Sequence, residues 1–185
     1  MQTCYETKRL ILKILTPDKC NSVLRFYKDN QELFEPLNPV TPKLYYTTDY
    51  QRSALTIEYQ RFLEGKSARY YVYLKDNPSK IIGTLSFSDI RRDFYQSAVI
   101  GYRFDQKFHH HGFATECLQK GIHALFTEEK IHRIEAYIQP FNVPSKQLVE
   151  RLGFRFEGTC FNHTMVQNKW QDMERYSLIS TDLHQ

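Results

Sequence analysis

The stretch from Ala98 to Glu116, AVIGYRFDQKFHHHGFATE, decides the fold of this 185-residue chain. Residues 98–104 are mostly β-branched, apolar or aromatic, which is typical of a strand. After Gly112, apolar residues recur at the three- and four-residue spacing of an amphipathic helix, at Ala114, Cys117, Leu118, Gly121, Ile122, Leu125 and Phe126. The sequence therefore predicts a strand that turns through a glycine into a helix.

This junction between strand and helix predicts an anion-binding site. The first N–H groups of a helix have no partner inside it, and the helix dipole places partial positive charge at the same end. A pyrophosphate would be well held there. Any strand–helix junction can use a glycine, so a purely structural role for Gly112 stays open on this evidence. The two familiar nucleotide loops, G-x-x-x-x-G-K-[ST] and G-x-G-x-x-G, do not occur in the sequence.

The segments on either side of the junction predict an α/β order. Before it, we expect a strand over 7–15, a helix over 17–29, a loop without regular structure over 35–42, a helix from Thr47 or Thr48 to Leu63, and strands over 70–74 and 81–87 that form an antiparallel meander with 98–104. After it, we expect a strand over 134–138, a helix over 142–152, and final strands over 154–160 and 172–179, with a turn near Asn168-Lys169.

Composition limits the class of protein. The chain is 41% hydrophobic and 15% aromatic, enough for a sizeable core, and nothing resembling a linker divides it, so we expect one domain over 1–185. A net charge of +4 is too small to require a DNA partner. The four cysteines lack C-x-x-C spacing, no N-terminal apolar signal is present and no apolar run approaches a membrane span, so we expect a cytoplasmic protein that does not enter membranes.

Several motifs in the second half of the chain resemble one family. They are the loop end Gly112-Phe113-Ala114-Thr115-Glu116, the strand His132-Arg133-Ile134-Glu135-Ala136, the element Asn142-Val143-Pro144-Ser145, the segment 152–158 (LGFRFEG) and the closing segment 172–178 (DMERYSL). Near the start, Glu6–Leu12 (ETKRLIL) resembles a first strand of the same family. The chain thus resembles the GCN5-related N-acetyltransferases (GNAT), in the branch that contains the ribosomal-protein N-terminal alanine acetyltransferases.

The resemblance implies a fold and a cosubstrate. The implied GNAT fold is a mixed, mostly antiparallel seven-stranded sheet flanked by about four helices, in the order strand, two helices, three strands, helix, strand, helix, two strands. Acetyl-CoA is implied to lie in a V-shaped opening between the fourth and fifth strands, here 98–104 and 134–138. The backbone of Tyr102, Arg103 and Phe104 is implied to bind the thioester oxygen, and that of His110, His111, Gly112, Phe113, Ala114 and Thr115 to bind the pyrophosphate. His109 stands where the family usually has Gln or Arg, so its side-chain contact departs from the pattern.

Four residues are candidates for the catalytic chemistry. By resemblance, Asn142 holds the pantetheine arm or a water, and Ser145 protonates the departing thiolate. Both are also good residues for the start of a helix, so helix capping is the alternative for each. Glu35 and His163 are candidate bases, directly or through water, with a solvated loop position as the alternative. An α-amino group has a pKa near 8, so acyl transfer to it needs no strong base.

Other ligands are less well supported by the sequence. His109-His110-His111 invites a metal, but consecutive side chains diverge and no ordered Cys, Asp or Glu spacing accompanies them, so we expect no metal. The 13 tyrosines are explained by strand and core positions, which leaves RNA binding as a minor alternative.

The acceptor is the most open point. The branch resemblance favours the N-terminal amine of a protein. The alternatives are a small amine, such as a polyamine, an amino acid or an antibiotic, and a non-catalytic module that only binds acetyl-CoA. Specificity is expected in Leu33–Tyr46 and Phe161–Gln171. The protein is expected to be a monomer or, through an exposed edge strand, a homodimer.

Overall fold

The structure is a computed structural model that describes residues 1–37 and 42–180. Its helices are α1 (Cys20–Asp29), α2 (Gln31–Phe34), α3 (Thr48–Leu63), α4 (Phe113–Thr127) and α5 (Val143–Arg151). Its strands are β1 (Cys4–Glu6), β2 (Leu10–Ile14), β3 (Ala68–Leu74), β4 (Ile81–Arg91), β5 (Ser97–Phe104), β6 (Arg133–Ile138), β7 (Arg155–Val166) and β8 (Lys169–Ile179). Three short 3-10 helices are η1 (Pro17–Lys19), η2 (Glu35–Leu37) and η3 (Gln106–Phe108).

One mixed sheet of eight strands runs through the molecule in the order β1-β2-β3-β4-β5-β6-β8-β7. All neighbours are antiparallel except β5 and β6, which are parallel. The expected mixed, mostly antiparallel sheet is confirmed, but the count of seven strands was wrong. A tight turn, in which Thr7 and Leu10 exchange backbone and hydroxyl hydrogen bonds, divides the segment predicted as one strand over 7–15 and adds β1.

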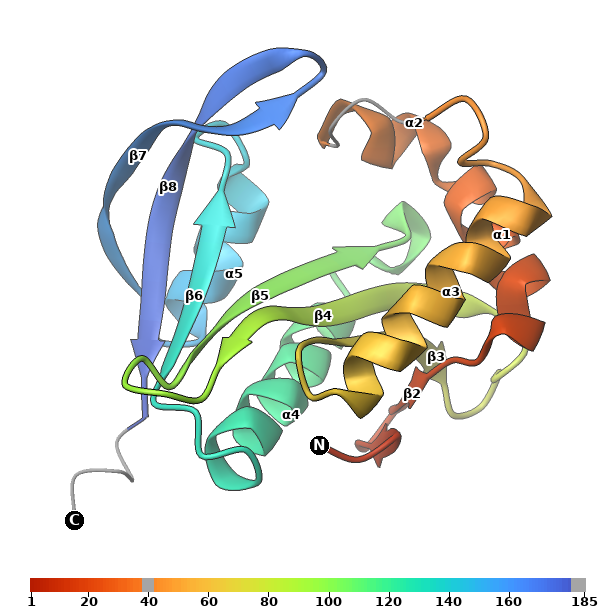
Figure 1. The fold of residues 1–185 in the computed structure, drawn as a ribbon, viewed down its shortest axis with the longest axis horizontal. Helices are drawn as coiled ribbons and strands as arrows, with labels where there is room; N and C mark the ends of the chain where they lie inside the picture. Colours follow the sequence, from red (N-terminus) through yellow and green to blue (C-terminus); the bar gives the residue numbers. More distant parts are fainter. Residues whose placement is uncertain (38–41, 181–185) are drawn as a thin grey trace.

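The helices form two layers on the sheet, with α1 and α3 on one face and α4 and α5 on the other (Figure 1). Alternation along β3 supports this arrangement, because Tyr70 and Val72 belong to the core under α4 while Tyr71 and Tyr73 belong to the core under α1 and α3. The described residues form five α-helices where about four were expected, since α1 ends at Asp29 and α2 begins after Asn30.

The proline-rich segment differs in part from its prediction. We expected no regular structure over 35–42, yet Glu35–Leu37 form η2. Pro36 fits there because the first turn of a helix needs no N–H donor from it. Residues 38–41 of that segment, which are also part of the expected specificity loop, lie outside the described residues.

The final hairpin is longer than predicted. Its strands β7 and β8 extend to Val166 and from Lys169, so the turn consists of Gln167 and Asn168, both with positive φ. Two consecutive residues in this conformation make the turn that suits the twist of a hairpin. The hairpin projects past the end of β6 toward α2 (Figure 1). Among the described residues, no helix is both long enough and apolar enough to cross a membrane.

Candidate functional site

The sheet opens between its two parallel strands. β5 and β6 pair through Ser97 with Arg133, Ala98 with Ile134 and Val99 with Glu135, and then diverge (Figure 1). Beyond Val99, no strand among the described residues pairs with the edge of β5 that faces β6, although β4 still pairs with the other edge as far as Phe104. The backbone of Tyr102, Arg103 and Phe104 therefore lies on the free edge of β5 where the two strands separate, as the family resemblance implied.

The start of α4 follows the C-terminal end of β5, after a loop that contains η3. Gly112 occupies the position before the helix with φ of 77°, a left-handed conformation that a side chain disfavours. His110, two residues earlier, also has positive φ, at 63°. This backbone path turns the chain from β5 into α4, whose first N–H groups have no acceptor within the helix. The predicted strand–glycine–helix junction is thus confirmed, with an arrangement suited to an anion.

An arginine from the first part of the sheet braces this loop. Arg9 donates from Nη1 to the His111 carbonyl at 3.0 Å, and its Cζ lies 4.5 Å from the centre of the Phe113 ring. Its Nε lies 2.7 Å from Oε2 of Glu116, whose Oε1 accepts from Thr7 Oγ1 at 2.6 Å. No role for the Arg9 side chain was predicted, because its partners are more than 100 positions away in the sequence.

The carboxylate of Glu116 holds Arg9 in this position. Burial raises its pKa, but hydrogen bonds from Thr7 and Arg9 outweigh that effect, so the net shift lowers the pKa. The group is therefore ionised at neutral pH, in the first turn of α4, where negative charge complements the helix dipole.

His109, at the position where the loop departs from the family pattern, makes a contact within the protein. Its Nε2 lies 3.0 Å from the carbonyl oxygen of Phe104, the last residue of β5. A carbonyl can only accept, so Nε2 carries the proton and donates. The ring thus ties the loop back to the strand that it leaves.

The start of α5 forms the other part of the opening. Asn142 accepts the backbone N–H of Ser145 on Oδ1 at 3.3 Å, so the capping interpretation of Asn142 holds. Tyr102 reaches across from β5 and donates its phenol to the Ser145 carbonyl at 3.2 Å. Burial raises the pKa of Tyr102 to about 12, which keeps the phenol protonated. Sequence reasoning gave a role to the Tyr102 backbone but missed its side chain.

The two candidate bases are held by different parts of the molecule. The Glu35 carboxylate accepts from Gln31 Nε2 at 2.8 Å and from the hydroxyl of Tyr46, whose pKa is raised to about 12, first by burial and then by this contact. His163 on β7 stacks on Tyr137 with ring centres 4.5 Å apart, and its Nδ1 lies 2.8 Å from Thr164 Oγ1.

The final hairpin contacts the start of η2, directly after α2. Gln167, at the tip of the hairpin, donates from Nε2 to the backbone carbonyl of Glu35 at 2.8 Å. The two segments expected to set specificity, 33–46 and 161–171, therefore touch each other. Nothing in the local sequence pattern pairs a hairpin turn with a segment about 130 positions away.

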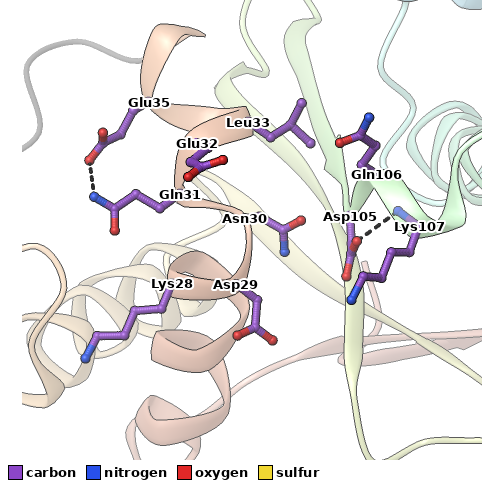
Figure 2. A pocket seen from close by; sticks show the side chains of 10 residues that line it. All are labelled: Lys28, Asp29, Asn30, Gln31, Glu32, Leu33, Glu35, Asp105, Gln106 and Lys107. Carbon is purple, nitrogen blue, oxygen red and sulfur yellow. Dashed lines mark hydrogen bonds between the residues drawn. The ribbon is translucent and has the colours of Figure 1, made fainter.

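A polar cavity lies between the corner of α1 and α2 and the end of β5 (Figure 2). It has a volume of about 730 Å³ and is lined by Lys28, Asp29, Asn30, Gln31, Glu32, Leu33, Glu35, Asp105, Gln106 and Lys107. Asp105 is buried at its base, where it accepts from the Lys107 backbone N–H and from Lys80 Nζ, both at 3.0 Å. Of the candidate site residues, Glu35 contributes to the cavity. In residues 1–37 and 42–180, no three His, Cys, Asp or Glu side chains form a group that could hold a metal.

Comparison with known proteins supports the same interpretation. A family model described as an acetyltransferase (GNAT) domain matches residues 9–155. The ribosomal protein uS5-alanine N-acetyltransferase of Escherichia coli is 27% identical over 177 residues, which cover 95% of this chain and 90% of that protein.

Two solved structures are similar in fold. The ribosomal-protein-S5-alanine acetyltransferase of Vibrio fischeri has a TM-score of 0.90 at 22% identity, with 98% of each chain covered. RimJ of Mycobacterium smegmatis, solved in complex with CoA-disulfide, has a TM-score of 0.87 at 25% identity, covering 95% of this chain and 84% of that chain. The fold expected from the sequence is therefore confirmed.

Proposed function

The chain belongs to the GNAT family of N-acetyltransferases, and we propose that it transfers the acetyl group of acetyl-CoA to the N-terminal amine of a protein. The observation that carries the proposal is the divergence of β5 and β6 beside the open N-terminus of α4. A relative that is 27% identical acts on an alanine of ribosomal protein uS5, and a similar structure holds a CoA compound. The first supports a protein as acceptor, and the second supports a CoA thioester as donor.

The residues around the opening fit acetyl-CoA. Backbone N–H groups at the start of α4, where Gly112 allows close approach, suit a pyrophosphate. In this proposal the pyrophosphate is bound by the backbone of His110, His111, Gly112, Phe113, Ala114 and Thr115. The pantetheine arm would run along the free edge of β5.

Three functions of the chain's own groups follow. A backbone N–H in the stretch Tyr102, Arg103 and Phe104 donates to the thioester oxygen, where negative charge develops during attack. The hydroxyl of Ser145 gives a proton to the departing thiolate. Asn142 fixes the first turn of α5 and so holds Ser145 in place, while Tyr102 ties that turn to β5.

The acceptor amine needs little help to lose its proton. An α-amino group has a pKa near 8, so an adequate fraction is neutral at pH 7. We propose that Glu35 takes the proton released after attack, through water in the adjacent cavity. The second candidate for the base is His163, which lies on β7 of the final hairpin.

A small amine is the second candidate acceptor. The polar cavity of about 730 Å³ favours it, because a molecule of modest size with amino and hydroxyl groups could be held there. The hydrogen bond from Gln167 to Glu35 also favours a small acceptor, because it joins the final hairpin to η2 and so encloses the site on that side. The third candidate is a non-catalytic module, which would bind acetyl-CoA and would need no acceptor.

One experiment separates these functions. Acetyl-CoA binding is measured by calorimetry, and the same sample is then assayed for free thiol with N-terminal peptides, polyamines and amino acids. Thiol release with peptides, at higher kcat/KM than with small amines, is the expected result. Thiol release with small amines alone would mean that the acceptor is a small amine and not a protein. Acetyl-CoA binding without thiol release would favour the non-catalytic module.

We further propose that residues 1–185 act as one domain and that the protein is located in the cytoplasm, where ribosomal proteins are available as acceptors.

A further inference from the structure

Arg103 lies on the wall of the opening, but its side chain is on the opposite face from its neighbours. Tyr102 and Phe104 pack with the core under α4 and α5. Because side chains alternate along a strand, Arg103 projects toward α1 and α3. The register agrees, since Arg103 pairs across β4 with Thr84, and Thr84 pairs with Tyr71 of the core under α1 and α3.

Aromatic side chains surround the guanidinium. Its Cζ lies 5.6 Å from the centre of the Phe34 ring. Tyr27, Tyr45 and Tyr46 all lie close enough to Arg103 to interact with its charge. Tyr45 is at the centre of this group, with ring centres 5.3 Å from Tyr27 and 5.0 Å from Tyr46. Arg103 is thus a cation at the edge of an aromatic cluster.

No carboxylate in the part of the chain that the structure describes forms an ion pair with this cation. The neighbouring Arg69 pairs with Glu58 at 2.8 Å, whereas the Arg103 side chain makes no hydrogen bond or ion pair with any residue in the described ranges 1–37 and 42–180. Glu35 is near through Tyr46, but its carboxylate is bound by Gln31 and Tyr46. Burial lowers the pKa of Arg103 and the charge of Arg69 adds to this, although Tyr27 opposes it. A largely buried cation without an anionic partner costs free energy, which a bound anion would recover.

The position of Arg103 relates it to the acceptor. Its backbone belongs to the stretch proposed to bind the thioester oxygen. Two residues back on the same face, Gly101 presents no side chain, and a Cβ there would lie 3.0 Å from Ser86 Oγ. An amine that approaches the thioester from the α1 and α3 face would therefore pass over Gly101 and beside Arg103.

We propose that the Arg103 guanidinium binds a carboxylate of the acceptor, so that the preferred substrates are protein N-termini with Asp or Glu among their first three residues. This inference rests on the proposed function, because it names the substrate class of that site. A guanidinium forms paired hydrogen bonds with a carboxylate and selects it over a neutral amide. The same cation disfavours a nearby ammonium, which increases the neutral, reactive fraction of the amine.

The test compares matched peptides on the unmodified protein. In each set, three peptides differ at one residue, which is Glu, Gln or Lys, and the first, second and third residues are varied in turn. The value of kcat/KM is measured for each peptide by thiol release. In at least one set we expect the Glu peptide to exceed the Gln peptide at least tenfold and the Lys peptide to be poorest. Equal values for Glu and Gln at all three positions would overturn the inference, and this comparison needs no variant to fold.

Variants then assign the preference to Arg103. Arg103→Gln should reduce the ratio between the Glu and Gln peptides to about one, mainly through KM for the peptide, while Arg103→Lys should retain part of it. Arg61→Gln, which removes the same charge from an exposed position near the end of α3, should leave the ratio unchanged. A preference that survives in Arg103→Gln, with acetyl-CoA affinity intact, would overturn the assignment.

The failure of the inference differs from the failure of the proposed function. Peptides that turn over without any charge preference refute the role of Arg103 and leave the N-terminal acetyltransferase in place. Acetyl-CoA binding without thiol release from any peptide refutes the proposed function, and the inference with it.

Discussion

The phenol of Tyr102 on β5 donates a hydrogen bond of 3.2 Å to the backbone carbonyl of Ser145 in α5. The two residues are 43 positions apart, and they belong to the two sides of the opening between β5 and β6. This contact fixes the first turn of α5, and with it the Ser145 hydroxyl, relative to the edge of β5. Because burial raises the pKa of Tyr102 to about 12, the contact persists across the neutral range.

Tyr102→Phe should therefore lower the rate more than the stability. We expect kcat to fall about tenfold, because Ser145 is no longer held at a fixed distance from the strand. The free energy of unfolding should fall by about 1 kcal/mol, the usual value of one hydrogen bond. Stopped-time thiol assays and urea denaturation give the two quantities. Tyr137→Phe, which removes a phenol from β6 that donates to Glu135, is the matched control and should leave kcat within about twofold. A fall in stability alone would assign Tyr102 to packing.

Ser145 and Asn142 can now be separated by substitution. The cap is made by the Asn142 side chain and the Ser145 backbone N–H, so the Ser145 hydroxyl has no part in it. Ser145→Ala should leave stability within about 0.5 kcal/mol and lower kcat at least tenfold. Asn142→Ala should destabilise the protein by about 1 kcal/mol through the lost cap. Thermal melting and kcat are measured on both variants, and an unchanged kcat in Ser145→Ala would reject its role as acid.

The sequence predicted the parts of this site that depend on local pattern. The strand–glycine–helix junction follows from the periodicity between 98 and 126 and from Gly112, and the cap at Asn142 follows from residue type. Both are confirmed because they depend on local chemistry: glycine tolerates the left-handed turn into α4, and a polar side chain accepts an N–H group at the start of α5. The opening between β5 and β6 followed from the family resemblance, since no local pattern tells where two parallel strands separate.

The parts that were missed are contacts between distant residues. Arg9 meets Glu116 at a separation of 107 positions, and Gln167 meets Glu35 at 132. Periodicity reports which face a side chain occupies, but not which segment folds against that face. β1 was missed for a related reason, because three residues are too few for an alternating pattern to be distinguished.

Gly112 should be required for its conformation. A Cβ there would meet little, since its nearest neighbour, Arg9 Nη2, would be 3.5 Å away, but φ of 77° is disfavoured for any residue with a side chain. Gly112→Ala should cost about 1 kcal/mol of stability and weaken acetyl-CoA binding at least tenfold as the loop shifts. Gly112→Asn, a residue that tolerates this region, should retain more of both. Calorimetry and urea denaturation measure them, and equal affinity for all three proteins would place the pyrophosphate elsewhere.

Glu157 should make the stability of the protein depend on pH. Its carboxylate on β7 binds the Arg133 guanidinium of β6 and accepts from Ser177 Oγ of β8 at 2.6 Å, so it joins three strands. The hydrogen bonds from Arg133, and then from Ser177, lower its pKa to about 2. A lowered pKa means that the folded protein binds the proton less tightly than the unfolded chain does. The contribution is therefore present above about pH 4.5 and is lost as pH falls from there toward 2.

Glu157→Gln tests this at several pH values. Because the group is partly exposed and screened by solvent, we expect a loss of roughly 1 kcal/mol at pH 7 rather than the full value of the shift. The difference between the two proteins should shrink steadily between pH 4.5 and 3, because the carboxylate of the unfolded chain takes up a proton in this range while the native carboxylate stays ionised. Urea denaturation at pH 7, 5, 4 and 3 gives the free energy of unfolding of each protein. Glu32→Gln, at an exposed position on α2 without an ion pair among the described residues, is the control and should show no such trend. A difference that stays constant from pH 7 to 3 would mean that Glu157 stabilises the three strands by packing or neutral hydrogen bonds, and not through its charge.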